Sequence, residues 1–256
     1  MDIFDLLMNR RTIRDYLGRD IDDALLEKIL KAGCRTSTTG NMQLYSIIVT
    51  RDAAMKEKLL PLHFNQRMVT AAPVVLTFCA DFNRFSLWCR LRKAEPGYDN
   101  FLSFFTAAID ALLAAQTVCI AAEASGLGIC YLGTTIYMAH KIIEVLNLPK
   151  GVVPVTTVTL GWPATIPDQV DRLPAEAVIH NEVYLNYTGE KIEQFYREKE
   201  SRADSERFIK ENNKETLAQV FTDVRYKKTD NINFSNILLK VLADQGFMNN
   251  SPLPTS

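Results

Sequence analysis

The sequence predicts an α+β fold. Stretches with helical periodicity and short apolar stretches typical of strands are mixed along the chain, without the strict alternation that a doubly wound sheet requires. The 256 residues are 47% apolar and 23% charged, which is an ordinary composition for a globular protein. A chain of this length buries enough surface to fold without disulfides or structural metals, and its length leaves one domain or two open.

The first eighty residues predict helices and strands separated by turns. Asp2 and Asp22 can each cap the start of a helix, and apolar residues recur at helical spacing after Asp22. In order, we expect a helix at 2–8, a helix that begins at Asp22, a turn-rich segment at 35–41, a strand at 44–50, a polar helix at 53–60 and a strand at 73–80.

The longest apolar stretch predicts a central helix at 101–125, which ends at Gly126. It is long enough to cross a membrane. However, it contains Asp110, Gln116 and Glu123. Carboxylates in the middle of a membrane span are costly, so we expect a buried helix of a soluble protein and no membrane partner.

The rest of the chain changes in character after Pro163. Before it we expect a loop or short mobile helix at 84–100, a short strand at 129–132, a helix at 138–146 and a strand at 152–160. After it the chain is polar with several prolines, and from Tyr184 it is charged and helical, with a final amphipathic helix at 234–242. Such a tail buries little by itself, so we expect it to wrap a core or a partner subunit.

Charge and cysteine usage exclude several classes of protein. The net charge is -1, which argues against a general nucleic-acid binder. The five cysteines form no CxxC pair, so we expect reduced thiols in a cytoplasmic protein. The three histidines are scattered, and we expect no metal site. The N-terminus lacks the long apolar core and cleavage site of a signal peptide.

Three arginines and a hydroxyl lie within five residues near the N-terminus, at Arg10, Arg11, Thr12 and Arg14. Guanidinium groups bind phosphate oxygens through paired, charge-assisted hydrogen bonds. The same residues could form a solvated basic helix end, where cations suit the helix dipole. Taken alone, the segment favours that plainer interpretation.

The segment 37–43 is rich in hydroxyl groups and ends just before the first predicted strand. It offers backbone N–H groups and short polar side chains to a planar polar ligand. An ordinary turn uses the same residue types. The two interpretations are evenly matched on the sequence alone.

Glycines at 126, 128 and 133 surround a short predicted strand. They are not a dinucleotide fingerprint, because their spacing is wrong and they follow a helix instead of a strand. Gly126 is predicted to cap the helix in the left-handed conformation. Gly133, at the end of a strand, would permit the close approach of a ligand ring.

A fourth segment follows the last predicted strand. Arg172, after the turn-like residues 160–163, is either part of a plain turn or a further phosphate-binding cation. No serine–histidine–aspartate set, pair of catalytic carboxylates or phosphate-binding loop is present elsewhere in the sequence.

Taken together and in order, these segments resemble the FMN-dependent nitroreductase family. They are most similar to its branch of NADPH-dependent flavin reductases and oxygen-insensitive nitroreductases. No single segment is specific, but the ordered set is. The matching segments are 10–14, 37–43, 66–69, 79–84, 121–133, 160–163 and 172–174, and the tail that ends at 244–247 resembles the C-terminal extension of that branch.

The resemblance implies an α+β nitroreductase-like fold, with a mostly antiparallel sheet flanked by helices, in a homodimer. It implies an FMN-binding nitroreductase domain at 1–187 and a helical C-terminal extension at 188–256 that wraps the dimer. FMN would lie at the subunit interface. The residues implied to bind it are Arg10, Arg11, Thr12, Arg14 and Arg172 at the phosphate, Thr38 from the partner chain, Gln66 with Asn65 at the pyrimidine edge, and Tyr131, Leu132, Gly133 and Thr134 along the other face.

The resemblance also implies the chemistry. Electrons would pass from NADPH or NADH through FMN to nitroaromatics, quinones or free flavins in a ping-pong cycle. We expect no catalytic acid or base on the protein. An N–H near Gly133 would reach the flavin N5, and cations near the pyrimidine edge would favour the reduced flavin.

This chain departs from the branch in two places. Val170 and Asp171 stand where the branch commonly has lysine and proline, so one phosphate cation is lost and an anion is added. Thr12 replaces the more usual serine and keeps the hydroxyl. In this branch, basic residues of the extension bind the phosphate of NADPH, and the resemblance does not identify which residues of this chain correspond to them. The candidates are Arg197, Lys199, Arg202 and Arg207.

Three other hypotheses remain open. The first is a flavin-binding protein for storage or sensing, which the altered residues at 170 and 171 favour slightly. The second is a relative that reduces a dedicated metabolite, with residues 84–100 as the lid of its pocket. The third is a scaffold with no cofactor, which requires the resemblance to be accidental.

Overall fold

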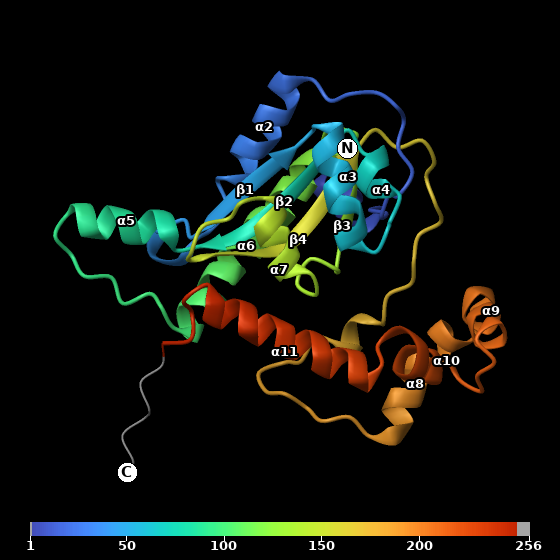
Figure 1. The fold of residues 1–256 in the computed structure, drawn as a ribbon. Coiled ribbons are helices and arrows are strands. Elements are labelled where there is room, and N and C mark those ends of the chain that lie inside the picture. Colours follow the sequence, from blue (N-terminus) through green and yellow to red (C-terminus); the bar gives the residue numbers. More distant parts are fainter. Residues whose placement is uncertain (1, 250–256) are drawn as a thin grey trace, which may run out of the picture. The chain divides into compact units, whose positions relative to one another are not determined.

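The computed structural model describes residues 2–249. The chain forms two compact units, one made of the residues up to Asp168 together with those from Phe234 onward, and the other of Gln169–Asn233. Figure 1 traces the order of the elements along the chain. These units do not coincide with the segments 1–187 and 188–256, and the division into an FMN-binding domain and an extension that wraps a dimer stays a prediction.

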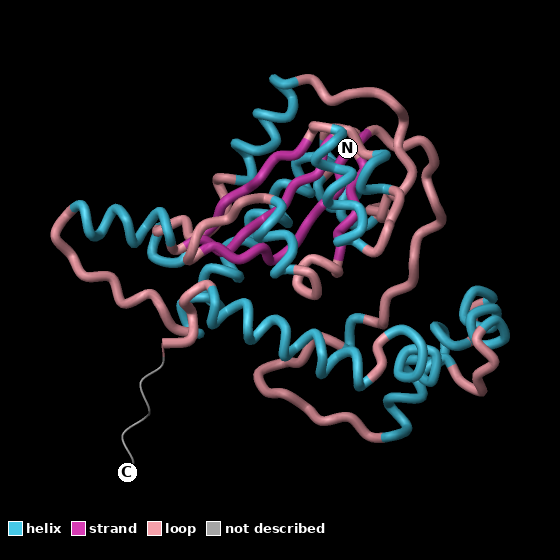
Figure 2. The backbone as a smooth tube through the Cα atoms, in the orientation of Figure 1, coloured by secondary structure: helices cyan, strands magenta, loops and turns pink. Residues whose placement is uncertain are grey.

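A four-stranded sheet forms the centre of the first unit, as can be followed in Figure 2. Every neighbouring pair of strands is antiparallel, and all eight residues of the second strand are buried. The prediction of an α+β fold with a mostly antiparallel sheet is therefore confirmed. The strands, in their order across the sheet, are β1 (Tyr45–Thr50), β2 (Val74–Asp81), β4 (Val152–Gly161) and β3 (Gly128–Leu132).

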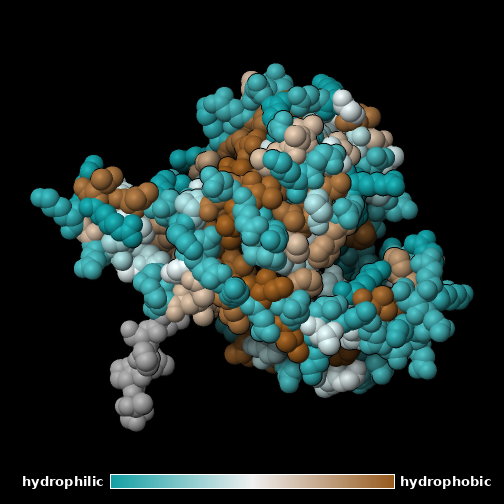
Figure 3. Space-filling view, in the orientation of Figure 1, coloured by the Kyte–Doolittle hydropathy of each residue, from teal (hydrophilic) through white to brown (hydrophobic). Residues whose placement is uncertain are grey.

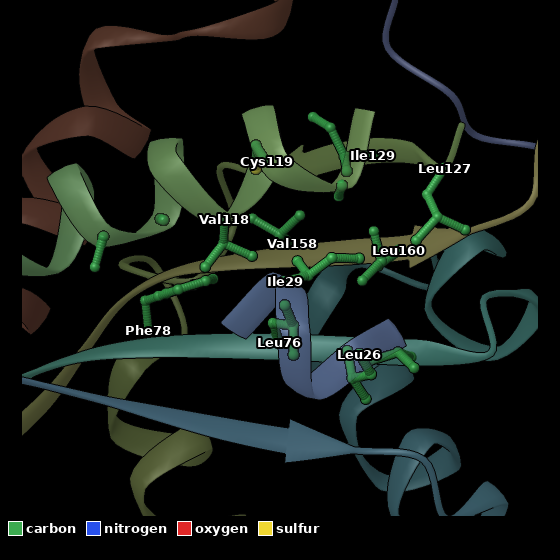
Figure 4. Packing of buried hydrophobic residues seen from close by; sticks show 14 of the residues in the cluster. Leu26, Ile29, Leu76, Phe78, Val118, Cys119, Leu127, Ile129, Val158 and Leu160 are labelled. Atoms are coloured by element: carbon green, nitrogen blue, oxygen red, sulfur yellow. The ribbon is translucent and has the colours of Figure 1, made fainter. Parts of the chain in front are cut away.

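Helices cover both faces of this sheet, because alternate residues of a strand point to opposite sides. Leu76 and Phe78 of β2 join the cluster formed with α2 (Asp23–Gly33) and α6 (Phe101–Ala124), as Figure 4 shows. Val75 joins a second cluster with Leu59 and Val69, which come from α3 (Ala53–Leu59) and α4 (Met68–Ala71).

The central helix α6 lies against the sheet through small side chains. Its inward-facing alanines, which include Ala107, Ala111 and Ala114, are 0% exposed. Gly33 of α2 meets α6 where a Cβ atom would lie 2.1 Å from the Val118 side chain, so only glycine allows this approach. The helix is long and apolar enough to cross a membrane, but half of its apolar stretch is buried inside the protein, as in a core helix.

Several local predictions are confirmed. Asp2 accepts a hydrogen bond from the N–H of Ile3, and Asp22 accepts two from the first turn of α2. Gly126 has a φ of 81°, as predicted for the left-handed end of α6. The remaining elements of the first unit are α1 (Ile3–Met8), 3₁₀ turns at Thr39–Asn41 and Leu60–His63, α5 (Asn83–Leu91) and α7 (Ala139–Val145).

The second unit is helical and has a small core of its own. Its buried residues include Phe195, Leu217 and Val220. Arg225 lies over the ring of Phe208, with 4.5 Å between the guanidinium carbon and the ring centre. Its elements are a 3₁₀ turn (Ala175–Ala177), α8 (Gly189–Glu200), α9 (Ala203–Glu211), α10 (Leu217–Val220), a π turn (Phe221–Arg225) and the start of α11 (Lys228–Asp244).

The last helix returns to the first unit. It begins six residues before the predicted start at 234, because the polar residues from Lys228 continue the helix without an apolar face. Val241, Leu242 and Phe247 pack with Phe104 and other residues in a third cluster. The N–H of Gly151 donates to the carbonyl of Gln245 at 3.0 Å. This end of the tail thus wraps a core of its own chain, one of the two predicted outcomes.

A buried carboxylate on α6 holds the loop that precedes β1. Asp110 is 1% exposed. Its Oδ1 accepts from the N–H and hydroxyl of Thr39 at 2.9 and 3.1 Å, and its Oδ2 accepts from the N–H of Leu44 at 3.2 Å. The two oxygens thereby satisfy both ends of the segment 39–44.

We expect Asp110→Ala to lower the free energy of unfolding by at least about 3 kcal/mol, because the buried N–H of Leu44 is left without its acceptor and two hydrogen bonds from Thr39 are lost. Asp110→Asn keeps one acceptor and should give an intermediate loss. Urea unfolding measures both, with Glu27→Ala on the exposed face of α2 as the control. Equal midpoints for Asp110→Ala and the control would show that the carboxylate does not hold the loop.

Candidate functional site

The arginine segment leaves α1 and runs alongside the start of β3. Thr12 pairs with Ile129 in a parallel bridge, and the N–H of Ile13 donates to the carbonyl of Ile129 at 2.9 Å. A Cβ on Gly128 would lie 2.4 Å from the Ile13 side chain. Gly128 therefore has to be glycine for the arginine segment to reach the sheet.

Arg10 and Arg11 line a cavity of about 300 Å³ together with Asn9, Glu123 and Gly128. Arg11 donates from one terminal nitrogen to the Asn9 carbonyl at 2.8 Å. Its Nε is buried and finds no hydrogen-bond partner among residues 2–249. A buried, unpaired N–H on a cation is costly, so this cavity suits an anion that would accept from it.

The other two residues of the segment differ in their surroundings. Arg14 is exposed. Burial raises the pKa of the Cys130 thiol on β3, and the positive charge of Arg14 opposes that rise. Thr12 is half-buried beside Ile129. The structure therefore brings Arg10, Arg11, Thr12 and Arg14 to one end of β3, and their role at a phosphate stays a prediction.

Arg10 is not a fully available cation. Its Nε lies 3.3 Å from Oε1 of Glu123 on α6. Burial raises the pKa of Glu123, and the neighbouring Arg10 lowers it. Glu123 of the central helix is thus paired with a cation from the arginine segment. Much of the positive charge of Arg10 is offset by this pair, and Arg11 and Arg14 carry the remaining positive charge.

The other end of β3 carries the predicted ring-binding residues. Leu132 is buried, Tyr131 is half-buried, and Gly133 is exposed. The Tyr131 hydroxyl donates to Oε1 of Gln116 on α6 at 3.4 Å. No atom lies within 4 Å of the place where a Cβ of Gly133 would be, so the backbone there is open to a ligand.

Gln66 lies in a turn that is joined to this same loop. After the 3₁₀ turn, Phe64 and Asn65 both have left-handed φ values, 54° and 55°. The N–H of Gln66 then donates to the His63 carbonyl at 3.1 Å. Nδ1 of His63 lies 2.8 Å from the hydroxyl oxygen of Thr134. The Gln66 turn and the Thr134 loop, distant in sequence, are thus neighbours in space.

No motif in the sequence points to His63. It is 0% exposed, and burial lowers its pKa to about 4. The only signal in the sequence was a polar ring among apolar residues at 59–64. Such a residue is buried only when a distant part of the chain supplies a partner, and the sequence does not reveal that partner.

The last two predicted residues belong to other parts of the chain. Thr38 is half-buried and precedes the segment that Asp110 holds; its predicted role comes from the partner chain. Arg172 is exposed and belongs to the second unit. Beside it, the carboxylate of Asp171 accepts from Lys199 at 2.8 Å, which lowers the pKa of Asp171.

Residues 7–162 match the nitroreductase family. An oxygen-insensitive NADPH nitroreductase of Salmonella typhimurium is 38% identical over 180 residues, which cover 70% of this chain and 73% of that protein. An FMN reductase (NADPH) of Bacillus subtilis is 32% identical over 205 residues, which cover 75% of this chain and 82% of that protein.

A solved structure of a Bacteroides fragilis protein has a TM-score of 0.95 with this chain at 59% sequence identity. The similarity covers 96% of this chain and 100% of that one. The region matched by the family contains the arginine segment, the Gln66 turn and the whole of β3. The resemblance seen in the ordered motifs is therefore confirmed, and the chain belongs to the nitroreductase family.

Proposed function

We propose that this chain is an FMN-dependent oxidoreductase that passes electrons from NADPH or NADH to nitroaromatics, quinones or free flavins. The observation that carries the proposal is the buried, unpaired Nε of Arg11 in its cavity at the start of β3. The related proteins of Salmonella typhimurium and Bacillus subtilis are named as an NADPH nitroreductase and an FMN reductase, which supports it.

The two ends of β3 suit the two ends of FMN. From Ile129 to Gly133 a strand rises roughly 13 Å. That separation suits a molecule whose phosphate and ring system are joined by a short sugar-alcohol chain. Arg10, Arg11, Thr12 and Arg14 would hold the phosphate. Gln66 and the residues from Tyr131 to Thr134 would hold the ring.

The protein supplies position and charge, and bound FMN supplies the centre that accepts and gives up a hydride. Burial lowers the pKa of His63 to about 4 and raises the pKa of Tyr131 above its usual range. Neither side chain therefore titrates near neutral pH. This supports a site without a catalytic acid or base. In such a site the nicotinamide and the electron acceptor would bind one after the other against the same exposed face of the flavin ring.

Arg172 stays a predicted ligand of the phosphate, as the family resemblance implies. The anion that this chain carries beside it, Asp171, is neutralised by Lys199. The added negative charge that favoured a weakly binding storage or sensing protein is therefore offset within the second unit. We retain the reductase as the function, in a cytoplasmic protein, which its five free cysteines support.

A homodimer is part of the proposal, because α6 presents an apolar stripe to the outside. Leu102, Phe105, Ile109 and Leu112 recur at helical spacing and are 71%, 52%, 42% and 45% exposed. Figure 3 shows apolar surface exposed on the molecule. Apolar patches of this kind mark interaction sites. A second copy of the chain would cover the stripe and would place its Thr38 at the FMN of the first.

We expect Arg11→Gln to raise the dissociation constant for FMN by about ten- to a hundredfold, the cost of one charge-assisted hydrogen bond in a buried cavity. Titration of the apoprotein with FMN, followed by flavin fluorescence, measures the change. Arg92→Gln, at an exposed arginine outside the site, is the control. An affinity equal to that of the control would remove Arg11 from the phosphate site.

We expect the flavin absorption bands of the purified protein to bleach when NADPH is added without oxygen. They should return when a nitroaromatic or a quinone is then supplied, because the acceptor takes up the electrons. Stopped-flow absorbance follows both halves of the cycle. Bands that persist with both NADPH and NADH would contradict a reductase and favour a flavin-binding protein.

We expect Leu112→Glu to convert the dimer to a monomer, because a charge within the apolar stripe cannot be buried at an interface without an opposite charge beside it. Sedimentation velocity gives the oligomeric state. Leu91→Glu is the matched control, since Leu91 is 75% exposed on α5. A Leu112→Glu protein that sediments like the wild type would show that α6 is not the interface.

A further inference from the structure

His63 joins two segments that the proposed site needs side by side. It ends the 3₁₀ turn at Leu60–His63, three residues before Gln66. Its Nδ1 lies 2.8 Å from the hydroxyl oxygen of Thr134, which is 8% exposed and follows β3. This is a direct polar contact between the Gln66 turn and the loop that carries Gly133, and both residues are buried.

The turn between His63 and Gln66 needs such support. Phe64 and Asn65 are consecutive non-glycine residues with left-handed φ values of 54° and 55°. Asparagine tolerates that region, but for a bulky residue such as Phe64 it costs free energy that the surroundings must offset. A second contact between the same segments helps, because the rings of Phe64 and Tyr137 stack with centres 6.4 Å apart.

The hydrogen bond has a preferred direction. Nε2 of His63 is buried and has no partner among residues 2–249. If Nε2 carried the proton, a buried N–H donor would be left unpaired, which is costlier than an unpaired acceptor. The proton is therefore on Nδ1, and His63 donates to Thr134. The hydrogen of the Thr134 hydroxyl is then available for a bound ligand.

We propose that His63 is a positioning residue for the ring end of the site: by donating from Nδ1 to Thr134 it holds the Gln66 turn against the loop after β3. Gln66 and Thr134 then meet the same bound ring, and the Thr134 hydroxyl is oriented toward it. The inference rests on the proposed function, since it assigns a role at the FMN site. The low pKa of His63, caused by burial, keeps the imidazole neutral and in this arrangement at physiological pH.

The test is a double-variant cycle on FMN affinity with His63→Leu, Thr134→Val and the two combined. We expect His63→Leu to raise the dissociation constant about tenfold in the wild-type background. In the Thr134→Val background it should have almost no effect, because His63 acts through the hydroxyl. Fluorescence titration of the apoproteins gives the four constants, and circular dichroism confirms that each variant is folded.

Two further variants separate positioning from plain stability. His63→Asn keeps a donor close to the place of Nδ1 and should restore FMN affinity to within about threefold of the wild type. It also serves where His63→Leu fails to fold. His140→Asn is the matched control. Nδ1 of His140 is also buried without a partner in the described part of the chain, but His140 lies on α7 and outside both segments. Its FMN affinity should equal that of the wild type.

The absorption spectrum of bound FMN gives a readout that a merely structural role would not change. With His63→Leu the bands should move toward those of free FMN, since the ring is held less tightly. Equal and independent effects of His63→Leu and Thr134→Val would overturn the inference, as would unchanged affinity in His63→Leu. Those results leave the proposed function intact, whereas a wild-type protein that binds no FMN overturns both.

Discussion

Close packing of α6 against the sheet is the constraint on which the rest of the structure depends. The helix is apolar on nearly every side, so the sheet can cover only part of its apolar surface. Its alanine face, with Ala111 and Ala114, lets the helix axis approach β2 and β4. At other positions on the helix Asp110 holds the loop before β1, and Glu123 pairs with Arg10. The remaining apolar stripe, which includes Leu112, is the part that the single chain leaves exposed.

The candidate site follows from the position of β3 beside this helix. One end of the strand receives the arginine segment through the bridge between Thr12 and Ile129, and Gly128 makes that approach possible. The other end leads into the open backbone at Gly133. His63 then draws the Gln66 turn to the same place. The candidate site is therefore assembled from three segments of the chain, and β3 is common to its two halves.

Charge is distributed in a way that residue identity does not reveal. Arg10 and Arg11 are adjacent in sequence, yet Arg10 is paired with Glu123 and Arg11 keeps an unpaired buried donor. Likewise Asp171 looked like an unfavourable anion beside a predicted phosphate cation, but Lys199 neutralises it. In both cases a partner from a distant part of the sequence changes the net charge that a ligand would meet.

Patterns within a few residues were determined by the sequence alone. Helical spacing, the capping residues Asp2 and Asp22, the glycine stop at Gly126 and the order of strands along the chain depend on local sterics and hydrogen bonding, and the structure has them as expected. The ordered motifs also sufficed to identify the family. Contacts across the chain were decided by the tertiary structure: the partner of His63, the loop held by Asp110 and the return of α11 to the first unit. These depend on which distant segments pack together, and no short window of sequence contains that information.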